Sequence, residues 1–266
     1  KDFAPHAVKA GAVVIDNSSA FRMDPDVPLV VPEVNPQAIL KHKGIIANPN
    51  CSTIIMVMAL KPIYDLAKIK RVIVSTYQAV SGAGKEGIDE LDAQVRDHSE
   101  GREMTANILP SASAEKHYPI AFNLIPQIDV FCDNLYTKEE MKMVNETKKI
   151  MEDYEMRITA TTIRVPVYRS HSESVNIELE KEVDLGAMRE ALAKFPGVTV
   201  QDDPSKQEYP MPLYTSEKDD VYVGRLRRDE SCEKSYNMWV VGDQIRKGAA
   251  LNTLQIAETM IKNGWI

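Results

Sequence analysis

The sequence has few cysteines and no long apolar run. Its three cysteines, Cys51, Cys132 and Cys232, share no regular spacing, which argues against a disulfide framework and favours a reducing cytoplasm. No histidines cluster beside them, so a structural metal site is not expected. The longest apolar run, 54–60, is far shorter than the roughly 20 residues of a membrane-spanning helix. We therefore expect a cytoplasmic protein without metal or membrane contact.

An excess of positive charge is also missing. The formal net charge is -7 and the lysines and arginines are scattered, which excludes a nucleic-acid-binding surface. The 266 residues suffice for one large domain or two ordinary ones. The chain opens at Lys1 in what resembles the end of a helix, followed by the apolar run 12–15. We expect an upstream segment of this α/β unit to be absent from the sequence.

Short apolar runs bounded by Pro, Gly, Asn and Asp predict strands buried on both faces of a parallel sheet. Early in the chain these runs are 12–15, 29–31 and 44–47. A helical pattern follows from Asn50 to Ala67, although Pro62 should kink or interrupt it. Residues 100–136 contain three prolines and show weak periodicity, so we expect an irregular connection there.

Later in the chain the pattern mixes strands and helices. Thr137 and Glu140 form a capping box that opens a helix to about Tyr154. Other helices are expected at 84–99, 184–195 and 248–263, and strands at 71–77, 158–168, 172–179, 198–200, 221–228 and 238–241. This order predicts an α/β protein in which a parallel α/β domain precedes an α+β domain, with the last helix able to return to the first.

Cys51 is the strongest candidate for chemistry. It lies in Asn-Pro-Asn-Cys-Ser-Thr, 48–53, between a buried strand and a helix. There the unpaired N–H groups and the helix dipole should lower the pKa of the thiol, and they could hold an oxyanion. Because free cysteines are commonly small buried residues, position alone favours a nucleophile and a packing residue about equally.

Other polar residues could assist such a nucleophile. His171, between two predicted strands, could act as general acid/base, although a hydrogen-bonded loop histidine is the commoner case. Arg164 lies in an apolar strand and must be paired, with either a structural or a substrate carboxylate. Glu139 and Lys142 lie one turn apart on the capped helix, and this spacing alone favours a surface ion pair.

Gln78 follows the predicted strand 71–77 and precedes the turn Ser81-Gly82-Ala83-Gly84. Such a turn could present backbone N–H groups to a cofactor. It is equally an ordinary connection between a strand and a helix, so neither feature is specific by itself.

Together these motifs resemble aspartate-β-semialdehyde dehydrogenase, in the branch found in many Gram-positive bacteria. The matching stretches keep the family's order and are 16–22, 30–35, 48–54, 75–84, 164–167 with His171, and 247–252. The resemblance implies a partial Rossmann-type domain, 1–50 and 247–266, and a catalytic and dimerisation domain with a mixed sheet, 51–246. The family's N-terminal glycine-rich phosphate loop has no counterpart near residue 1, so we expect weak NADPH binding.

The resemblance implies NADPH-dependent reductive dephosphorylation of β-aspartyl phosphate to aspartate semialdehyde, in lysine/diaminopimelate, threonine and methionine biosynthesis. Cys51 would form a thioester, His171 would be the acid/base and Gln78 would orient the intermediate. Arg164 would grip the substrate carboxylate, and Glu139 would meet its amino group. The remaining implied roles are phosphate binding for Arg22 and Lys142, substrate contact for Asn50, and NADP contacts for Ser81, Gly82 and Asn252.

Two alternatives stay open. N-acetyl-γ-glutamyl-phosphate reductase uses the same residue types, but its nucleophile has Gly before it and Tyr after it, where this chain has Asn50 and Ser52. The other alternative is a non-catalytic dimeric relative, which would not need the set Cys51, Gln78, Arg164 and His171. The resemblance also implies a homodimer, or a tetramer built from it.

Overall fold

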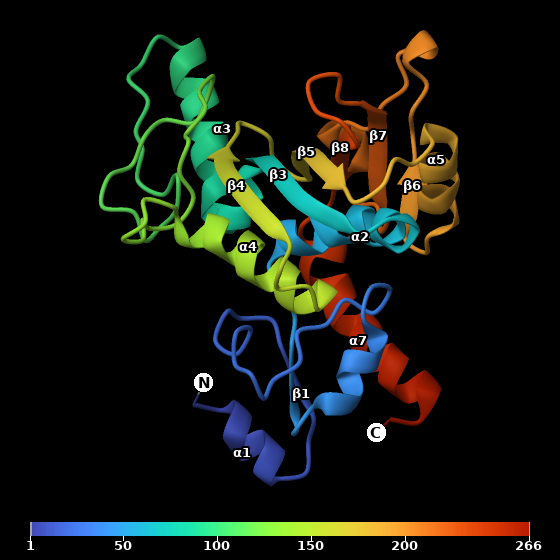
Figure 1. Ribbon diagram of the computed structural model, residues 1–266. Coiled ribbons are helices and arrows are strands. Elements are labelled where there is room, and N and C mark those ends of the chain that lie inside the picture. Colours follow the sequence, from blue (N-terminus) through green and yellow to red (C-terminus); the bar gives the residue numbers. More distant parts are fainter. Residues whose placement is uncertain (1, 266) are drawn as a thin grey trace.

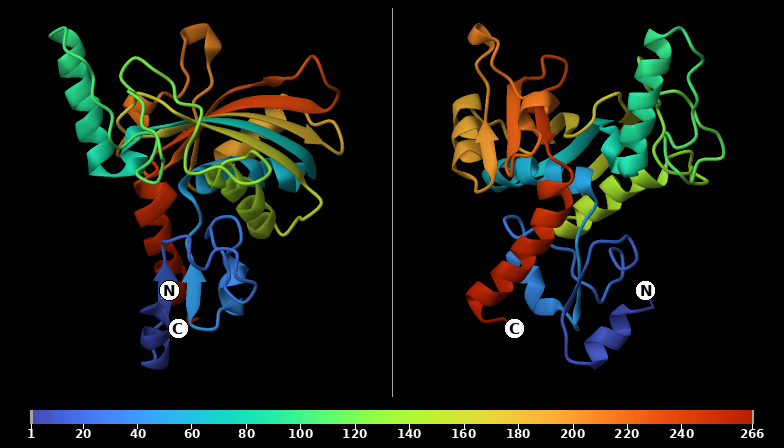
Figure 2. Two further views of the ribbon diagram at one scale, coloured as in Figure 1. Left: turned by 90° about the vertical axis from the view of Figure 1, so that its left-hand side faces the viewer. Right: turned by 180° about the vertical axis from the view of Figure 1, so that it is seen from behind.

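The computed structural model describes residues 2–265, which form two lobes stacked one above the other (Figure 1). The lower lobe holds a two-stranded parallel sheet in which Val14 pairs with Ile45. Its elements are α1 (Ala4–Lys9), β1 (Val14–Asp16), η1 (Pro36–Lys41) and β2 (Ile45–Ala47). The last helix, α7 (Leu251–Asn263), runs down from the upper lobe and packs on β1 and η1 (Figures 1 and 2). The core of the lower lobe is therefore built from both ends of the chain.

The upper lobe is organised around a mixed six-stranded sheet, in the order β4-β3-β5-β8-β7-β6. The strands are β3 (Ile69–Gln78), β4 (Arg157–Arg164), β5 (His171–Leu179), β6 (Val198–Val200), β7 (Val221–Arg228) and β8 (Ser235–Gly242). The pairs β3–β4 and β6–β7 are parallel, and the other neighbours are antiparallel. The predicted combination of a parallel α/β part and a mixed sheet is confirmed.

Helices cover one face of this sheet. They are α2 (Cys51–Leu66), α4 (Lys138–Met151) and α5 (Leu185–Lys194), and α2 packs on both of the others and on β3, β7 and β8. Residues 52–60 of α2 are all buried, which explains why this helix is apolar all round instead of amphipathic. Pro62 lies inside α2, yet the helix continues to Leu66, so the expected interruption does not occur. The start of this central helix fixes the position of Cys51.

Two predicted strands differ from the structure. Residues 29–31 do not form a strand: Leu29 makes an isolated bridge to Ala47, because the flanking Pro28 and Pro32 cannot donate to a longer ladder. The strand predicted to reach residue 168 ends at Arg164 as β4, since the residue before Pro166 is restricted and the proline has no N–H to continue the pairing. That early end makes Arg164 the last residue of β4, opposite the end of β3.

The irregular connection is confirmed, because no helix or regular strand lies between α3 (Lys85–Ser99) and α4. Its path is nevertheless fixed by two buried side chains of α3. The carboxylate of Glu90 accepts from the amides of residues 107–109 at 2.6–3.0 Å, and Gln94 Oε1 accepts from the amides of Ile120 and Ala121. This anchoring brings Pro110 beside the strand ends of the sheet.

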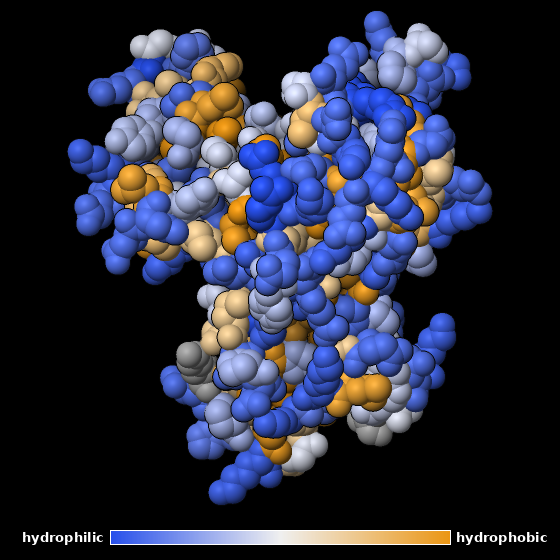
Figure 3. All heavy atoms as spheres, in the orientation of Figure 1, coloured by the Kyte–Doolittle hydropathy of each residue, from blue (hydrophilic) through white to orange (hydrophobic). Residues whose placement is uncertain are grey.

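Short helical segments complete the chain. They are η2 (Val80–Ala83), η3 (Pro204–Lys206), α6 (Pro212–Thr215) and the π-helical η4 (Arg246–Ala250). The face in Figure 3 is mostly hydrophilic, with apolar side chains in small groups and a narrow waist between the lobes. Within residues 2–265, no helix combines the length and apolar character needed to cross a bilayer.

Candidate active site

Three polar side chains meet at one end of the six-stranded sheet. Gln78 ends β3 and lies opposite Arg164 at the end of the parallel strand β4. Strand β5 runs antiparallel to β3, so its first residue, His171, starts at the same end. Their exposed fractions are 2%, 3% and 0%. Sheet topology therefore gathers residues that are up to 93 positions apart in the sequence.

Cys51 reaches this cluster from the N-terminus of α2. Asn50 is the N-cap, and its Oδ1 accepts from the Thr53 amide at 3.2 Å. Segment η4 passes close by: a Cβ at Gly248 would lie 2.9 Å from Cys51 Cβ. Glycine is therefore required there, and the half-buried thiol is enclosed on that side by backbone.

The thiol pKa differs from expectation. Burial and the negative charge of Glu139 raise the pKa of Cys51 to about 12, although Arg22 and hydrogen bonds from Ser52 act in the opposite direction. The prediction of a lowered pKa is wrong for the ligand-free protein, because the helix start is desolvated and faces a carboxylate. Cys51 rests as a neutral thiol.

His171 is held as a neutral imidazole. Its Nδ1 accepts from the Ala79 amide at 3.0 Å, so the ring carries its proton on Nε2. Burial, and then the neighbouring Arg164 guanidinium, place the pKa of His171 well below its ordinary range. Nε2 lies 3.5 Å from Gln78 Nε2. The imidazole thus offers an N–H donor to the site.

The Arg164 guanidinium is buried without a counter-ion. Its Nη1 donates to Ala79 O at 2.7 Å, and its Nε and Nη2 donate to Pro110 O at 3.3 and 3.2 Å. Within residues 2–265 no carboxylate forms an ion pair with it. Burial lowers the pKa of Arg164, while the charges of Glu139 and Cys51 oppose that shift. The structure therefore excludes a structural carboxylate partner within residues 2–265, and the binding of a substrate carboxylate by Arg164 stays a prediction.

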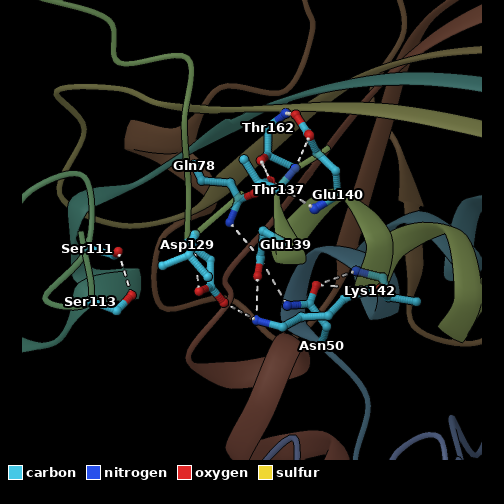
Figure 4. Close-up of polar contacts among 12 residues, drawn as sticks. Asn50, Gln78, Ser111, Ser113, Asp129, Thr137, Glu139, Glu140, Lys142 and Thr162 are labelled. Carbon is cyan, nitrogen blue, oxygen red and sulfur yellow. Dashed lines mark hydrogen bonds and ion pairs between the residues drawn. The ribbon is translucent and has the colours of Figure 1, made fainter. Parts of the chain in front are cut away.

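Glu139 is the hub of the network in Figure 4. Its Oε1 accepts from Asn50 Nδ2 at 2.9 Å and from Gln78 Nε2 at 3.2 Å, and its Oε2 accepts from Lys142 Nζ at 3.1 Å. Lys142 also donates to Asp129 at 3.0 Å. Burial opposes it, but these two carboxylates raise the pKa of Lys142. Glu139 is 5% exposed, so the pair is part of the site and not the surface pair that spacing alone favours.

Arg22 is the charged side chain that the lower lobe contributes to the site. Its Nε donates to Asn48 O at 2.9 Å and its Nη2 to Asn17 O at 3.2 Å. Its Nη1 pairs with Glu146 Oε1 at 3.3 Å. An arginine side chain has more N–H groups than these contacts use, so Arg22 retains donors for a further ligand. The site therefore lies where the two lobes meet.

Two charged residues of α4, Glu146 and Lys149, also lie at the site and were not identified from the sequence. Glu146 is 1% exposed, and Lys149 Nζ donates to three backbone carbonyls of the loop 22–27 at 2.7–2.8 Å. Together with Glu139 and Lys142 they follow a spacing of three, four and three residues, which places all of them on one face of a helix. Extending the Glu139–Lys142 pattern by two turns identifies both.

The predicted cofactor contacts lie in two places. Gly82 adjoins the cluster: a Cβ there would lie 2.9 Å from Arg164 Nη1. Gly82 also opens a Gly-x-Gly-x-x-Gly spacing that is visible in the sequence. At its second position Gly84 has φ +90°, and at its third a Cβ on Gly87 would lie 2.5 Å from Val80 O. Sequence reasoning missed this loop, which gives a close backbone approach to the site.

The remaining two contacts are already hydrogen-bonded. Ser81 Oγ accepts from Gln244. Asn252 Nδ2 donates to Val30 O at 3.0 Å and to Asn48 Oδ1 at 2.7 Å, so its amide joins the lobes. Roles for these residues, and for Asn50, in binding ligands stay predictions.

The site combines a cysteine at a helix start, a histidine N–H donor and a buried arginine. This combination is typical of an enzyme that works through a covalent acyl intermediate. Within residues 2–265 no cluster of three or more His, Cys, Asp or Glu side chains could hold a metal ion.

Comparison with known proteins agrees with that class. Residues 60–247 match the family model "Semialdehyde dehydrogenase, dimerisation domain", and residues 1–42 match "Semialdehyde dehydrogenase, NAD binding domain". The aspartate-semialdehyde dehydrogenase of Aquifex aeolicus is 57% identical over all of this chain and 77% of its own length. That of Bacillus subtilis is 54% identical over 97% of this chain and 75% of its own.

Solved structures give the same result. Aspartate semialdehyde dehydrogenase II from Vibrio cholerae superposes with a TM-score of 0.92 at 48% identity, over 98% of this chain and 76% of its own. The Candida albicans enzyme, crystallised with NADP, gives a TM-score of 0.74 at 26% identity, over 100% of this chain and 75% of its own. The chain belongs to the aspartate-semialdehyde dehydrogenase family of oxidoreductases, which confirms the family predicted from the sequence.

Proposed function

We propose that this chain carries out the NADPH-dependent, reversible reductive dephosphorylation of β-aspartyl phosphate to aspartate semialdehyde through a thioester on Cys51. The buried guanidinium of Arg164, which has no carboxylate partner within residues 2–265, carries the proposal, because a substrate carboxylate would neutralise its charge close to the nucleophile. Glu139 offers a buried carboxylate to an ammonium group. An aspartyl group has both a carboxylate and an ammonium, and so complements the two charges.

In the proposed reaction, Cys51 Sγ attacks the acyl carbon and the bond from that carbon to the phosphate oxygen breaks. The thiol proton leaves with the phosphate, which Arg22 and Lys142 hold. Bound NADPH supplies the hydride that reduces the thioester. The Nε2–H of His171 donates to the oxygen of the resulting hemithioacetal, which Gln78 orients. Collapse breaks the C–S bond and releases the aldehyde, and the sulfur takes a proton from solvent to restore the Cys51 thiol.

Substrate binding also prepares the thiol. The charge of Glu139 is one of the two influences that raise the pKa of Cys51. A substrate ammonium, in addition to the Lys142 ammonium already bonded to Glu139, weakens that influence further, so the substrate itself lowers the cost of forming the thiolate. The match of residues 1–42 to a NAD-binding domain supports the cofactor assignment, with Ser81, Gly82 and Asn252 as its proposed contacts in this part of the chain.

The charge on Glu139 separates this function from N-acetyl-γ-glutamyl phosphate reduction, because an N-acetylated substrate has no ammonium group to pair with it. Turnover of aspartate semialdehyde and of N-acetylglutamate semialdehyde, each with phosphate and NADP, tests the choice. We expect the former to react at least about 100-fold faster, equivalent to roughly 2.7 kcal/mol for a lost charge-assisted contact. Faster turnover of the acetylated compound would contradict the proposal.

The domain boundaries proposed are 1–50 with 247–266 for cofactor binding and 51–246 for catalysis and dimerisation. The separate sheets of the two lobes support this division, as does an apolar cluster that lies wholly within residues 1–50 and 247–266. We propose a cytoplasmic homodimer, or a tetramer built from it, that pairs through the sheet face without helices, where the ring centroids of Tyr77 and Trp239 lie 5.4 Å apart with the rings tilted. Light scattering that gives a monomer at micromolar concentration would contradict this assembly.

A further inference from the structure

Glu146 occupies a position between the phosphate-binding residue proposed above and the nucleophile. Its Oε1 accepts from Arg22 Nη1 at 3.3 Å, and its Oε2 accepts from the backbone N–H of Asn50 at 2.6 Å. The side chain is 2% exposed, so water screens its charge poorly. No step of the reaction above uses this carboxylate, yet it touches both the arginine for the anion and the residue before Cys51.

Arg22 does not depend on Glu146 for its orientation. Two other contacts, Nε to Asn48 O and Nη2 to Asn17 O, hold the guanidinium from backbone carbonyls. The nearby Lys149 does not offset the carboxylate directly, because its ammonium is bonded to three backbone carbonyls. Loss of the charge at residue 146 should therefore leave Arg22 in place and remove its only carboxylate partner within residues 2–265.

We propose that Glu146 is a positioning and charge-tuning residue that competes with phosphate for Arg22 and so keeps phosphate binding weak enough for rapid release. The inference rests on the proposed role of Arg22 in binding phosphate. A phosphate on Arg22 lies close to the Glu146 carboxylate, and the two negative charges repel each other in a poorly solvated site. Once the acyl group has moved to Cys51, this repulsion favours departure of the phosphate.

Substitution Glu146→Gln tests the proposal directly, with inorganic phosphate titrated into the chain by calorimetry or ³¹P NMR. We expect the phosphate Kd to fall about tenfold, the effect of one pKa unit of electrostatic interaction. A residue with a merely structural role would weaken binding or leave it unchanged. Unchanged or weaker phosphate binding by a folded Glu146→Gln protein would overturn the inference.

Glu140→Gln is the matched control. Glu140 is another buried carboxylate of α4, but it accepts from the amides of Thr137 and Thr162 and has no contact with Arg22. Its substitution should leave the phosphate Kd within about twofold of the wild type, since a charge that does not contact the anion site contributes little. Tightening by Glu140→Gln as large as that by Glu146→Gln would overturn the assignment to Glu146.

Two further variants complete the test. If Glu146→Gln does not fold by circular dichroism, Glu146→Asp withdraws the carboxylate from Arg22 and should tighten phosphate binding to a lesser degree. No tightening would overturn the inference.

Arg22→Ala separates the hypothesis of a phosphate site at Arg22 from the hypothesis on Glu146. If it leaves phosphate binding unchanged, the proposed phosphate site is wrong. If it weakens binding while Glu146→Gln does not tighten it, only the role of Glu146 fails.

Discussion

The upper lobe buries a continuous apolar core between its helices and the six-stranded sheet, whereas the lower lobe has a much smaller one. Of the buried apolar residues of the lower lobe, Val27, Leu29, Val31, Val34 and Ala47 pack with that large core. The others form a separate cluster of Val30, Ala38, Ile39, Ile46, Ile256 and Met260. Two of them come from α7, at the opposite end of the chain. The separate cluster of the lower lobe therefore depends on a helix that begins at the upper lobe.

The lobes also differ in what they contribute to the site. Most of the proposed catalytic and substrate-binding residues come from the upper lobe, and Arg22 comes from the lower. Polar contacts join the two: besides the Asn252 amide, the buried Lys247 ammonium donates to Glu33 at 2.6 Å and to Asn252 at 3.0 Å. Most of the proposed catalytic residues thus lie in the lobe with the larger apolar core, and hydrogen bonds and an ion pair attach the other lobe. Three predictions test this contrast.

The largest expected effect is the loss of kcat when the N–H donor of the upper lobe, His171, is replaced. His171→Asn removes the Nε2–H and should lower kcat by about 1,000-fold, within the range for a general acid/base. His171→Gln places an amide N–H near the same point and should lose less, roughly 10- to 100-fold, because the role is hydrogen-bond donation. Equal losses in the two variants, measured by steady-state kinetics with unchanged circular dichroism, would contradict the donor role.

An intermediate effect is expected on stability. Leu60→Ala in α2 and Ile256→Ala in α7 both empty a fully buried site, which costs about 2–5 kcal/mol. We expect Leu60→Ala to lower the free energy of unfolding of the whole chain. Ile256→Ala should raise amide hydrogen exchange only in the lower lobe, around β1 and β2. Faster exchange throughout the sheet of the upper lobe after Ile256→Ala would contradict the difference between the lobes.

The smallest effect concerns a buried carboxyl of the upper lobe. Glu173 is 0% exposed, neither of its oxygens has a hydrogen-bond partner among residues 2–265, and burial raises its pKa well above 4.5. Above pH 4.5 the folded state retains a proton that the unfolded state has lost, so stability falls as pH rises towards the folded pKa. Glu173→Gln removes this loss.

Urea unfolding at two pH values one unit apart, both above 4.5, checks the sign of this effect. We expect the stability of Glu173→Gln relative to the wild type to increase by about 1.4 kcal/mol per pH unit in that window. A constant difference between the two proteins would show that Glu173 does not retain its proton on folding.

Local signals in the sequence predict much of the upper lobe. The capping box at Thr137 is present in the structure, with Glu140 bonded back to the Thr137 amide, because the interaction joins residues of one turn. Cys51 likewise begins its helix as predicted, since Asn50 supplies an N-cap. The ionisation of Cys51 could not be predicted in this way, because it depends on Glu139, a residue 88 positions later in the chain that the fold brings near.

The lower lobe is harder to predict for the same reason. Residues 29–31 have the composition of a strand, but the pairing depends on neighbours and on prolines that allow only one bridge, at Leu29. The bond from Arg22 to Glu146 spans 124 positions. No local sequence pattern contains such a contact. The partners of the charged residues on α4 are therefore known only from the tertiary structure.

The most direct test of the account is to trap the acyl-enzyme. β-Aspartyl phosphate is mixed with the chain in the absence of NADPH, and the modified peptide is located by mass spectrometry. The account predicts one aspartyl group, labile to hydroxylamine, on Cys51 and none on Cys132 or Cys232, and no label on the Cys51→Ala protein. Label on another cysteine, or undiminished phosphate release by Cys51→Ala, would contradict the central claim.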